Sequence, residues 1–560
     1  MAHPHRDSAA GQADRGRTPL FAIAVFAALA GLWFCSGFYH DDAYITLRYA
    51  DRLLHGRGLT WSDGDRVEGF THPLWLGLIA LAGAVGAGFV TASRVLGLTA
   101  VVIVFAVWWK SKAWAAPLLI VATLPGLALW AWGGLETAGF CAWMIIGAWL
   151  AVTTRDRLAA AACPPDTARA AATGLAFAAA ALTRPEGLGA GLIAVVWIAF
   201  ARRLRPAVAA TAGLLLPVGA YLAFRIFYYG DTVPNPAHVK VEGLPLAFQL
   251  SSAGYYLRNS LPLWLPGAMG SLCALALASG KSVRLDPAHA AAGPLSNRTV
   301  PNGWFVAALT LPILTSTAVG GGDHMPGARF LVPVVVLLAF AAAVAGPPAA
   351  SRRRTLALGA LAAATLAQAG ILLTMPVKYD RAAAEGEPIG RFLEKTLSPG
   401  SLVSTATAGS EAFFAPSLRF LDPLGLNDRH IARRRITEFV TRWQVMPGHA
   451  KGDGPYVLSR RPDVVILGRA RGFLGTDPLD WFLTDFELLS SDEFRLLYRP
   501  YRFAVPLRPL DAVRLGVAQD GTRPPALELT AYLRSDSPAA SALAREGEPL
   551  TPPWLAAPRP

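Results

Sequence analysis

Long apolar stretches recur through the first two thirds of the chain, and they limit its possible fold more than any other feature. Between residues 19 and 374 these stretches follow one another with only short polar interruptions. A bilayer core of about 30 Å takes about 20 apolar residues per helical span. Hydrophobic residues make up 53% of the 560 residues and charged residues only 16%. The pattern therefore predicts a multi-pass α-helical membrane domain over residues 19–374, after a cytoplasmic tail over residues 1–18.

After residue 375 the character of the sequence changes. Charge becomes dispersed, prolines occupy turn positions, and short runs of β-branched residues occur, such as residues 464–467. These features predict a separate α/β soluble domain over residues 375–534. The last segment, residues 535–560, is rich in Ala and Pro and is expected to be disordered.

The placement of Lys and Arg predicts the topology, because short cytoplasmic loops collect basic residues. If residues 73–88 formed a full span, the first four basic clusters would lie outside. If they form a re-entrant or surface-lying segment of the first outer loop, every cluster lies inside. The clusters are Lys110 and Lys112; Arg155 and Arg157; Arg202, Arg203 and Arg205; Lys281 and Arg284; and Arg352, Arg353 and Arg354.

We adopt the second topology, with the N terminus cytoplasmic and the C-terminal domain outside an inner (plasma) membrane. The net charge of +13 is then explained by scattered inner loops, so nucleic acid is not an expected partner. Membrane lipid is expected to surround the helical domain. About eleven spans are expected, near residues 20–38, 92–109, 114–132, 138–153, 168–182, 188–201, 207–228, 262–279, 304–319, 328–346 and 355–374.

In this topology the unusual polar residues converge on the outer face. They lie in residues 40–44, 68–72, 133–137, 183–187, 231–240 and 321–329. An ionisable residue at the edge of the hydrocarbon is costly and therefore indicates a functional site. The first outer loop reads as a short surface helix from residue 43 to residue 54, ended by Gly56 and Gly58. Asp41 and Asp42 stand at its start, where a carboxylate can cap backbone amides or take part in catalysis.

These outer-loop motifs resemble those of the GT-C superfamily of polyprenyl-phosphate-sugar-dependent glycosyltransferases, in which an acidic pair opens a surface helix in the first long outer loop. More narrowly, they resemble the terminal arabinofuranosyltransferase family of mycobacterial cell-wall synthesis. The motifs are DD (41–42), LR (47–48), GDRVE (64–68), GLE (134–136), RPE (184–186), YYG (228–230) and GDHMPGAR (322–329), with weaker matches at DPLGLN (422–427) and PDVVIL (462–467). The resemblance implies transfer of a sugar, arabinofuranose or a related one, from a polyprenyl-phosphate donor to a cell-envelope glycan or lipid acceptor on the outer face.

Chemistry gives separate reasons for these residue types. Sugar transfer needs a carboxylate to accept the proton of the incoming hydroxyl, whereas the departing phosphate needs cations. Asp41 is the candidate base, and Asp42 or Glu68 would orient the acceptor or stabilise positive charge on the sugar ring. The candidate phosphate ligands are Arg184, His238, Lys240, His324 and Arg329, and the supporting residues are Arg48, His72, Glu136, Glu186 and Asp323.

Several of these residues also have structural interpretations. Arg184 and Glu186 can pair at a helix end, Glu136 can cap the following span, and Arg329 can anchor at lipid headgroups. His324 can be an ordinary loop histidine. No cofactor is required, although the outer-loop acids with His324 would also suit a divalent cation such as Mg or Mn.

Two other function classes fit the membrane part of the chain. A lipid-linked sugar flippase without chemistry would share the multi-pass shell, but a transporter offers its site to both faces and places polar residues near the midplane. A scaffold protein whose outer domain binds glycan would leave the acids of the membrane loops unexplained. The one-sided placement of the polar residues therefore favours the glycosyltransferase.

Overall fold

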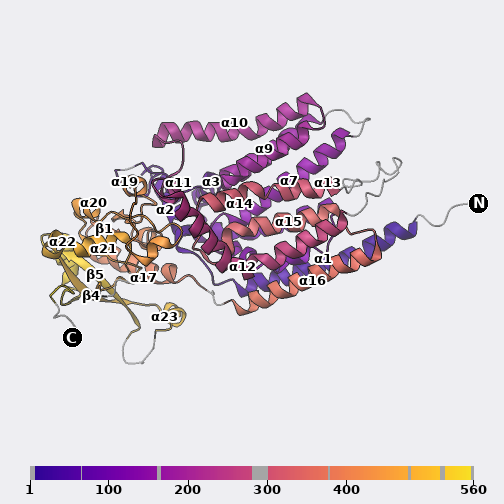
Figure 1. The fold of residues 1–560 in the computed structure, drawn as a ribbon. Helices are drawn as coiled ribbons and strands as arrows, with labels where there is room; N and C mark the ends of the chain where they lie inside the picture. The colour runs from indigo at the N-terminus through magenta and orange to yellow at the C-terminus, as the bar shows by residue number, and fades with distance from the viewer. Residues whose placement is uncertain are drawn as a thin grey trace, which may run out of the picture.

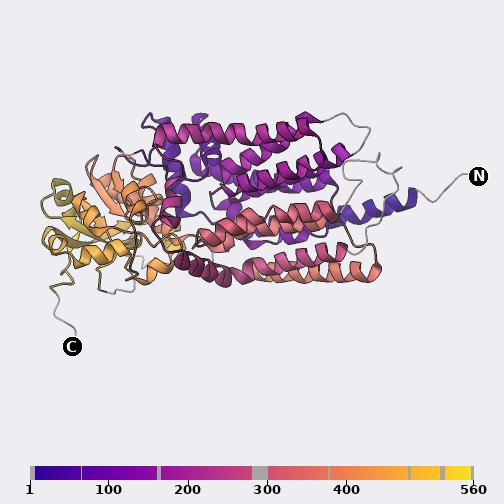
Figure 2. The same ribbon diagram turned by 45° about the horizontal axis from the view of Figure 1, so that its top comes forward.

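The structure is a computed structural model that describes residues 7–64, 66–159, 166–279, 300–375, 379–476, 481–517 and 524–555. A bundle of helices carries a sheet-containing domain at one end (Figure 1). Helix α1 (Asp7–Phe34) starts at the end of the bundle that lies away from this domain, as both views show (Figures 1 and 2). The expected tail over residues 1–18 is thus helical from Asp7 onward, and residues 1–6 lie outside the described residues.

Eight of the described helical segments are long and apolar enough to cross a membrane. The predicted fold class, a multi-pass helical membrane domain with a C-terminal α/β domain, is therefore confirmed. The helices concerned are α1, α4 (Phe89–Ser111), α7 (Thr137–Ala159), α10 (Leu204–Tyr229), α12 (Leu246–Ala278), α13 with α14 (Val300–Ala308 and Leu311–Val319), η2 with α15 (Pro326–Leu331 and Val332–Ala345) and α16 (Ser351–Thr374).

The expected count of about eleven spans is not confirmed. The segment expected at 114–132 is broken into two short helices, because Pro125 has no N–H with which to continue the first of them. Helix α3 (Pro73–Ala84), where a re-entrant or surface-lying segment was expected, has 12 residues and is about 18 Å long, too short for the hydrocarbon core. The shorter helices are α3 (Pro73–Ala84), α5 (Leu118–Ala122), α6 (Pro125–Trp132), α8 (Thr167–Thr183), α9 (Glu186–Ala199) and α11 (Asn235–Val241).

Burial separates the inner from the outer helices of the bundle. Every residue of α15 is buried, and α15 packs against α7, α12 and α13. By contrast, only 11% of the apolar window of α10 is buried inside the protein, and α10 runs along the outer edge of the bundle in both views (Figures 1 and 2). A helix that is apolar yet uncovered by protein suits contact with lipid.

The C-terminal domain is built on a six-stranded mixed sheet of order β2-β1-β3-β5-β4-β6. Strand β1 pairs in parallel with β2 and β3, and the remaining pairings are antiparallel. The run at 464–467 forms β3, as predicted. The strands are β1 (Leu402–Thr405), β2 (Arg419–Leu421), β3 (Val464–Ile466), β4 (Tyr498–Pro506), β5 (Ala526–Arg534) and β6 (Glu548–Pro549).

Short helices cover this sheet, and they extend into the tail that was expected to be disordered. Residues 535–555 are ordered instead, because Leu543 is fully buried and the Trp554 ring stacks 6.1 Å from that of Tyr532. The helices are α17 (Arg381–Thr396), α18 (Ser410–Phe413), α19 (Arg429–Arg433), η3 (Arg442–Val445), α20 (Gly454–Ser459), α21 (Leu483–Ser490), α22 (Asp492–Leu497), α23 (Pro509–Leu515) and α24 (Pro538–Ala544).

Helix α2 (Asp41–Leu54) is the predicted surface helix, and it lies between the bundle and the C-terminal domain, packed against α3 and α18. Its N-cap is His40, whose Nδ1 accepts the Asp42 backbone N–H at 3.2 Å, so neither aspartate caps it. Arg48 and Arg52 on this helix are 2% and 4% exposed, because Arg48 donates to carbonyls of the C-terminal domain and Arg52 pairs with Asp63 of the first outer loop. The helix is therefore buried on two sides.

Candidate active site

The two aspartates that open α2 have different surroundings. The Asp41 carboxylate accepts the backbone N–H groups of Gly409 at 3.1 Å and Ser410 at 2.8 Å, and the Ser410 hydroxyl at 2.5 Å. Gly409 approaches so closely that a Cβ there would lie 1.9 Å from the Asp41 carbonyl oxygen. Burial raises the pKa of Asp41 to about 6, with a further contribution from the nearby charge of Asp380. Asp41 thus holds α18 of the C-terminal domain against α2.

This geometry bears on the choice of Asp41 as candidate base. Its carboxylate already accepts three hydrogen bonds and the residue is only 6% exposed, so little of it is left for an incoming hydroxyl. The Asp42 side chain is 28% exposed, and it lies 3.9 Å from His40 Nδ1, which carries no proton because it accepts the Asp42 backbone N–H. Asp42 is therefore the acid of the pair that a substrate can reach.

Cationic and imidazole groups lie near Asp42. Burial lowers the pKa of Lys240, and the carboxylates of Asp323 and Asp42 oppose that shift. Burial likewise lowers the pKa of His449, which again feels the charge of Asp42. His324 is 29% exposed, and its ring stands 4.5 Å from that of His449 in an edge-to-face arrangement. We call Asp42, Lys240, Asp323, His324, Arg329 and His449 the junction cluster.

A glycine-rich turn positions one side of the junction cluster. Gly322 has a φ of +84°, and a Cβ there would lie 2.6 Å from Tyr256, so both the turn and the packing require glycine. The Gly322 carbonyl faces Lys240 Nζ at 3.5 Å. Next to it, Arg329 Nε pairs with Asp323 Oδ2 at 2.8 Å, and Asp323 is only 1% exposed.

The charged groups around this turn differ in how far neighbouring charges compensate them. Burial opposes ionisation of Asp323, but Arg329 and Lys240 outweigh burial and hold its pKa below the usual range. Burial, together with His449, holds the pKa of His324 well below its usual value, so this imidazole is neutral at pH 7. Lys240 has its ammonium 4.6 Å from the Phe330 ring centroid and no carboxylate within 4 Å among the described residues. It is the cation of the cluster best placed to bind an added anion.

A second buried network supports the junction cluster from the bundle side. Arg184 pairs with Glu136 at 3.1 Å and with Glu186 at 2.9 Å, and all three side chains are at most 7% exposed. His72 links Glu136 at 3.3 Å to the Thr46 hydroxyl at 2.7 Å on α2. Two glutamates therefore compensate the charge of Arg184. This agrees with the alternative in which Arg184 and Glu186 pair at a helix end.

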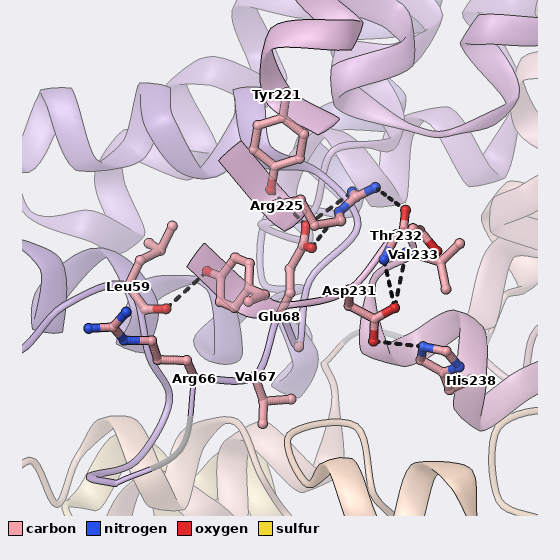
Figure 3. A network of polar contacts seen from close by, with 12 residues as sticks. Leu59, Arg66, Val67, Glu68, Tyr221, Arg225, Asp231, Thr232, Val233 and His238 are labelled. Atoms are coloured by element: carbon pink, nitrogen blue, oxygen red, sulfur yellow. Dashed lines mark hydrogen bonds and ion pairs between the residues drawn. The ribbon is translucent and has the colours of Figure 1, made fainter. Parts of the chain in front are cut away.

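Two residues expected in the site lie in a different network, shown in Figure 3. Glu68 accepts the Tyr221 hydroxyl at 2.7 Å and Arg225 Nε at 2.6 Å. His238 bonds Asp231 through Nε2 at 3.0 Å. Burial raises the pKa of Glu68, although Arg225 opposes the shift. Glu68 and His238 are thus fixed at the end of α10, apart from the junction cluster.

Arg48 likewise belongs to the contact between the two parts of the chain. Its Nε donates to the Trp61 carbonyl at 2.6 Å and its guanidinium to the carbonyls of Ala412 and Leu418 in the C-terminal domain. His449 and Ser410 were not expected from the sequence, since His449 lies in a loop of ordinary composition and Ser410 begins the four-residue helix α18, both far from α2 along the chain. Among the described residues, no group of three or more His, Cys, Asp or Glu side chains is arranged to hold a metal ion.

Comparison with known proteins gives a domain model that matches within the C-terminal part and a curated relative of about half of the chain. Residues 377–506 match the model of a domain of unknown function, DUF8728. The chain is 28% identical over 328 residues to the terminal β-(1→2)-arabinofuranosyltransferase of Mycobacterium tuberculosis. That match covers 53% of this chain, which spans about half the length, 51%, of the mycobacterial enzyme.

Two solved structures have a similar course of the chain. One is ArnT from Cupriavidus metallidurans bound to undecaprenyl phosphate, with a TM-score of 0.45 and 14% identity over 72% of this chain and 86% of that one. The other is the Archaeoglobus fulgidus oligosaccharyltransferase tethered to an acceptor peptide, with a TM-score of 0.44 and 10% identity over 87% of this chain and 73% of that one. Because both TM-scores lie below 0.5, we draw no functional conclusion from them. The similarity to a mycobacterial terminal arabinofuranosyltransferase, which the outer-loop motifs indicate, is confirmed over about half of the chain.

Proposed function

We propose that this chain is an integral membrane glycosyltransferase of the GT-C type. It transfers a sugar from a polyprenyl-phosphate donor to a cell-envelope glycan or lipid acceptor. The observation that carries the proposal is the junction cluster, in which the reachable carboxylate of Asp42 interacts with Lys240 and His449, beside the ion pair of Arg329 with Asp323. The same residue types serve both halves of the reaction, proton removal and phosphate departure.

In the proposed reaction the acceptor hydroxyl oxygen forms a bond to the anomeric carbon of the sugar. The bond from that carbon to the phosphate oxygen breaks, and polyprenyl phosphate leaves with the electron pair. Asp42 takes the hydroxyl proton. Lys240 binds the departing phosphate, with Arg329 beside it held by Asp323. No acid has to protonate the phosphate, because it leaves as an anion.

Other residues of the site and its surroundings receive supporting roles. Asp41 positions Asp42 by fastening α18 to the start of α2. His324, neutral at pH 7, and His449 offer uncharged hydrogen-bonding groups to sugar hydroxyls. Arg184, Glu136 and Glu186 keep the neighbouring helix ends in register. A divalent cation is not needed for this scheme, since the cations of the protein supply the positive charge.

The proposed location is an inner (plasma) membrane, with the N terminus in the cytoplasm and the C-terminal domain outside. Support comes from the basic clusters at the ends of α4, α7, α10 and α16, which lie at the end of the bundle away from the C-terminal domain. Cytoplasmic loops collect such residues. Lys281 and Arg284 lie outside the described residues.

The sugar is proposed to be arabinofuranose or a related pentose, on the strength of the similarity to the mycobacterial enzyme. The test incubates purified protein with a panel of radiolabelled polyprenyl-phosphate sugars and a cell-envelope glycan acceptor. Transfer of label to the acceptor by the wild type, and its loss in Asp42→Asn, is the expected result. Movement of labelled donor across a vesicle without any transfer would favour the flippase, and no transfer with any donor would refute the proposal.

A further inference from the structure

A second site lies outside the junction cluster, where the end of α10 meets the C-terminal domain. It is a cavity of about 950 Å³ lined by residues of the first outer loop, of the last turn of α10 and of the segment that includes α19 and α20. Its lining contains five arginines and one acid. The buried residues Glu68, Phe70 and Tyr229 separate this cavity from His72 and the junction cluster. We therefore assign the cavity no role in sugar transfer.

The arginines of this cavity differ in how far their charge is compensated. Arg433 pairs with Asp231, and Arg434 pairs with Glu487 at 2.7 Å. For Arg66, Arg429 and Arg460, no carboxylate among the described residues lies within the 4 Å of an ion pair. Three arginines that face one open cavity and make no ion pair within the described ranges favour an anionic ligand.

The uncompensated arginines are held by neutral groups. Arg429 donates to the carbonyls of Arg66 at 3.1 Å and Tyr229 at 2.5 Å, which ties α19 to the end of α10. The Arg66 guanidinium lies 4.7 Å from the Tyr228 ring centroid, and Figure 3 shows this side chain pointing away from Glu68. Aromatic and carbonyl groups thus hold these cations in place and leave their charge available.

The length of α10 indicates the level at which the cavity lies relative to the bilayer. Its 26 residues give a helix of about 39 Å, about 9 Å longer than the hydrocarbon core. The excess places the last turn, with Tyr228 and Tyr229, at the level of the lipid headgroups, where tyrosines are common. Beside this turn Phe227 is 91% exposed and Ile226 48% exposed. An apolar ridge therefore runs from the bilayer directly up to the basic cavity.

We propose that this cavity binds the anionic phosphate headgroup of a membrane lipid in the leaflet next to the C-terminal domain. The phosphate would lie against Arg66, Arg429 and Arg460, and the acyl chains would follow the exposed face of α10 past Phe227. Lipid chemistry is favoured over a soluble anion because the basic cavity and the apolar ridge adjoin. Such a lipid would bridge α10 and the C-terminal domain without entering the junction cluster.

The test compares lipid retention by the wild type and by two double variants. The cavity variant is Arg66→Gln with Arg460→Gln. The matched control is Arg514→Gln with Arg545→Gln, which removes two exposed arginines that do not line the cavity and make no ion pair within the described part of the chain. Each protein is reconstituted into nanodiscs of phosphatidylcholine with a minor share of phosphatidylglycerol. Lipid that stays bound after extraction is counted by native mass spectrometry.

Wild type and control are expected to retain phosphatidylglycerol in excess of its share in the nanodisc. Because one arginine near an anionic lipid surface contributes about fivefold to affinity, the cavity variant should bind it about 25-fold more weakly. No enrichment in the wild type, or equal enrichment in the cavity variant, would overturn the proposal. The proposal would also be overturned if the wild type in detergent bound glucose 1-phosphate as tightly as phosphatidylglycerol. The ligand would then be a soluble phosphosugar. A melting temperature of the cavity variant within about 2 °C of that of the control shows that it remains folded.

Discussion

Replacing each of the paired aspartates at the start of α2 should separate chemistry from structure. Asp42 has a 28% exposed side chain and no ionic contact shorter than 3.9 Å among the described residues. Asp42→Asn should therefore change the free energy of unfolding by less than about 0.5 kcal/mol. A general base contributes about 10²- to 10⁴-fold in rate. The variant should lose about that factor in the rate of sugar transfer while its affinity for the lipid donor stays close to that of the wild type.

Asp41 should behave in the opposite way. Asp41→Ala removes the acceptor of three hydrogen bonds from Gly409 and Ser410 in a buried contact. Each buried donor left without a partner costs about 1–2 kcal/mol, so the free energy of unfolding should fall by about 3–6 kcal/mol. Its transfer rate, measured at a temperature where the variant is still folded, should fall less than that of Asp42→Asn.

The assay combines single-turnover transfer from a radiolabelled polyprenyl-phosphate sugar with thermal unfolding in the same detergent. Single-turnover conditions report the chemical step rather than product release. Near-normal transfer by Asp42→Asn would refute the assignment of the base. A 10²-fold loss in Asp41→Asn without any change in melting temperature would return that role to Asp41.

Three further predictions follow from the contacts around the junction cluster and the sheet. Lys240→Ala should raise the donor KM about tenfold or more at an unchanged melting temperature, because one charge-assisted contact to phosphate is worth about 1.5–3 kcal/mol; a donor titration showing no change would remove Lys240 from the site. Arg184→Ala should destabilise the protein by about 3–5 kcal/mol, because it leaves Glu136 and Glu186 buried without a cation. Thermal unfolding checks this, and adding Glu136→Gln and Glu186→Gln should recover part of the loss. Burial raises the pKa of Asp485 to about 7; its contribution to stability is full below the unfolded pKa near 3.8 and is lost as the pH rises through 7. Asp485→Asn should flatten this part of the pH dependence of the unfolding free energy, and an unaltered curve would show that Asp485 is not its source.

The sequence was sufficient for the class of fold because that class depends on local patterns. Apolar runs of helical length, Lys and Arg at one set of ends, and the run at 464–467 each predict an element without reference to the rest of the chain. The same holds for α2, whose bounds follow from its periodicity and from Gly56 and Gly58, both with positive φ. Proline interruptions and short helices altered the number of expected spans, since chain length alone does not show how a segment lies in the bilayer.

For the candidate site too, local sequence patterns predict one part and contacts between distant segments decide the other. The sequence alone placed Asp41, Asp42, Lys240 and the turn at 321–329 on one face of the membrane. Only the tertiary structure decided which aspartate is available, because the groups that occupy Asp41 come from Ser410, 369 residues further along the chain. Glu68 is instead paired with Arg225, 157 residues away, and His449 joins the site from a loop with no distinguishing pattern. Hydrogen bonds and ion pairs between distant segments leave no periodicity in the sequence, so the identity of a polar residue shows that it is costly to bury but not which partner compensates that cost.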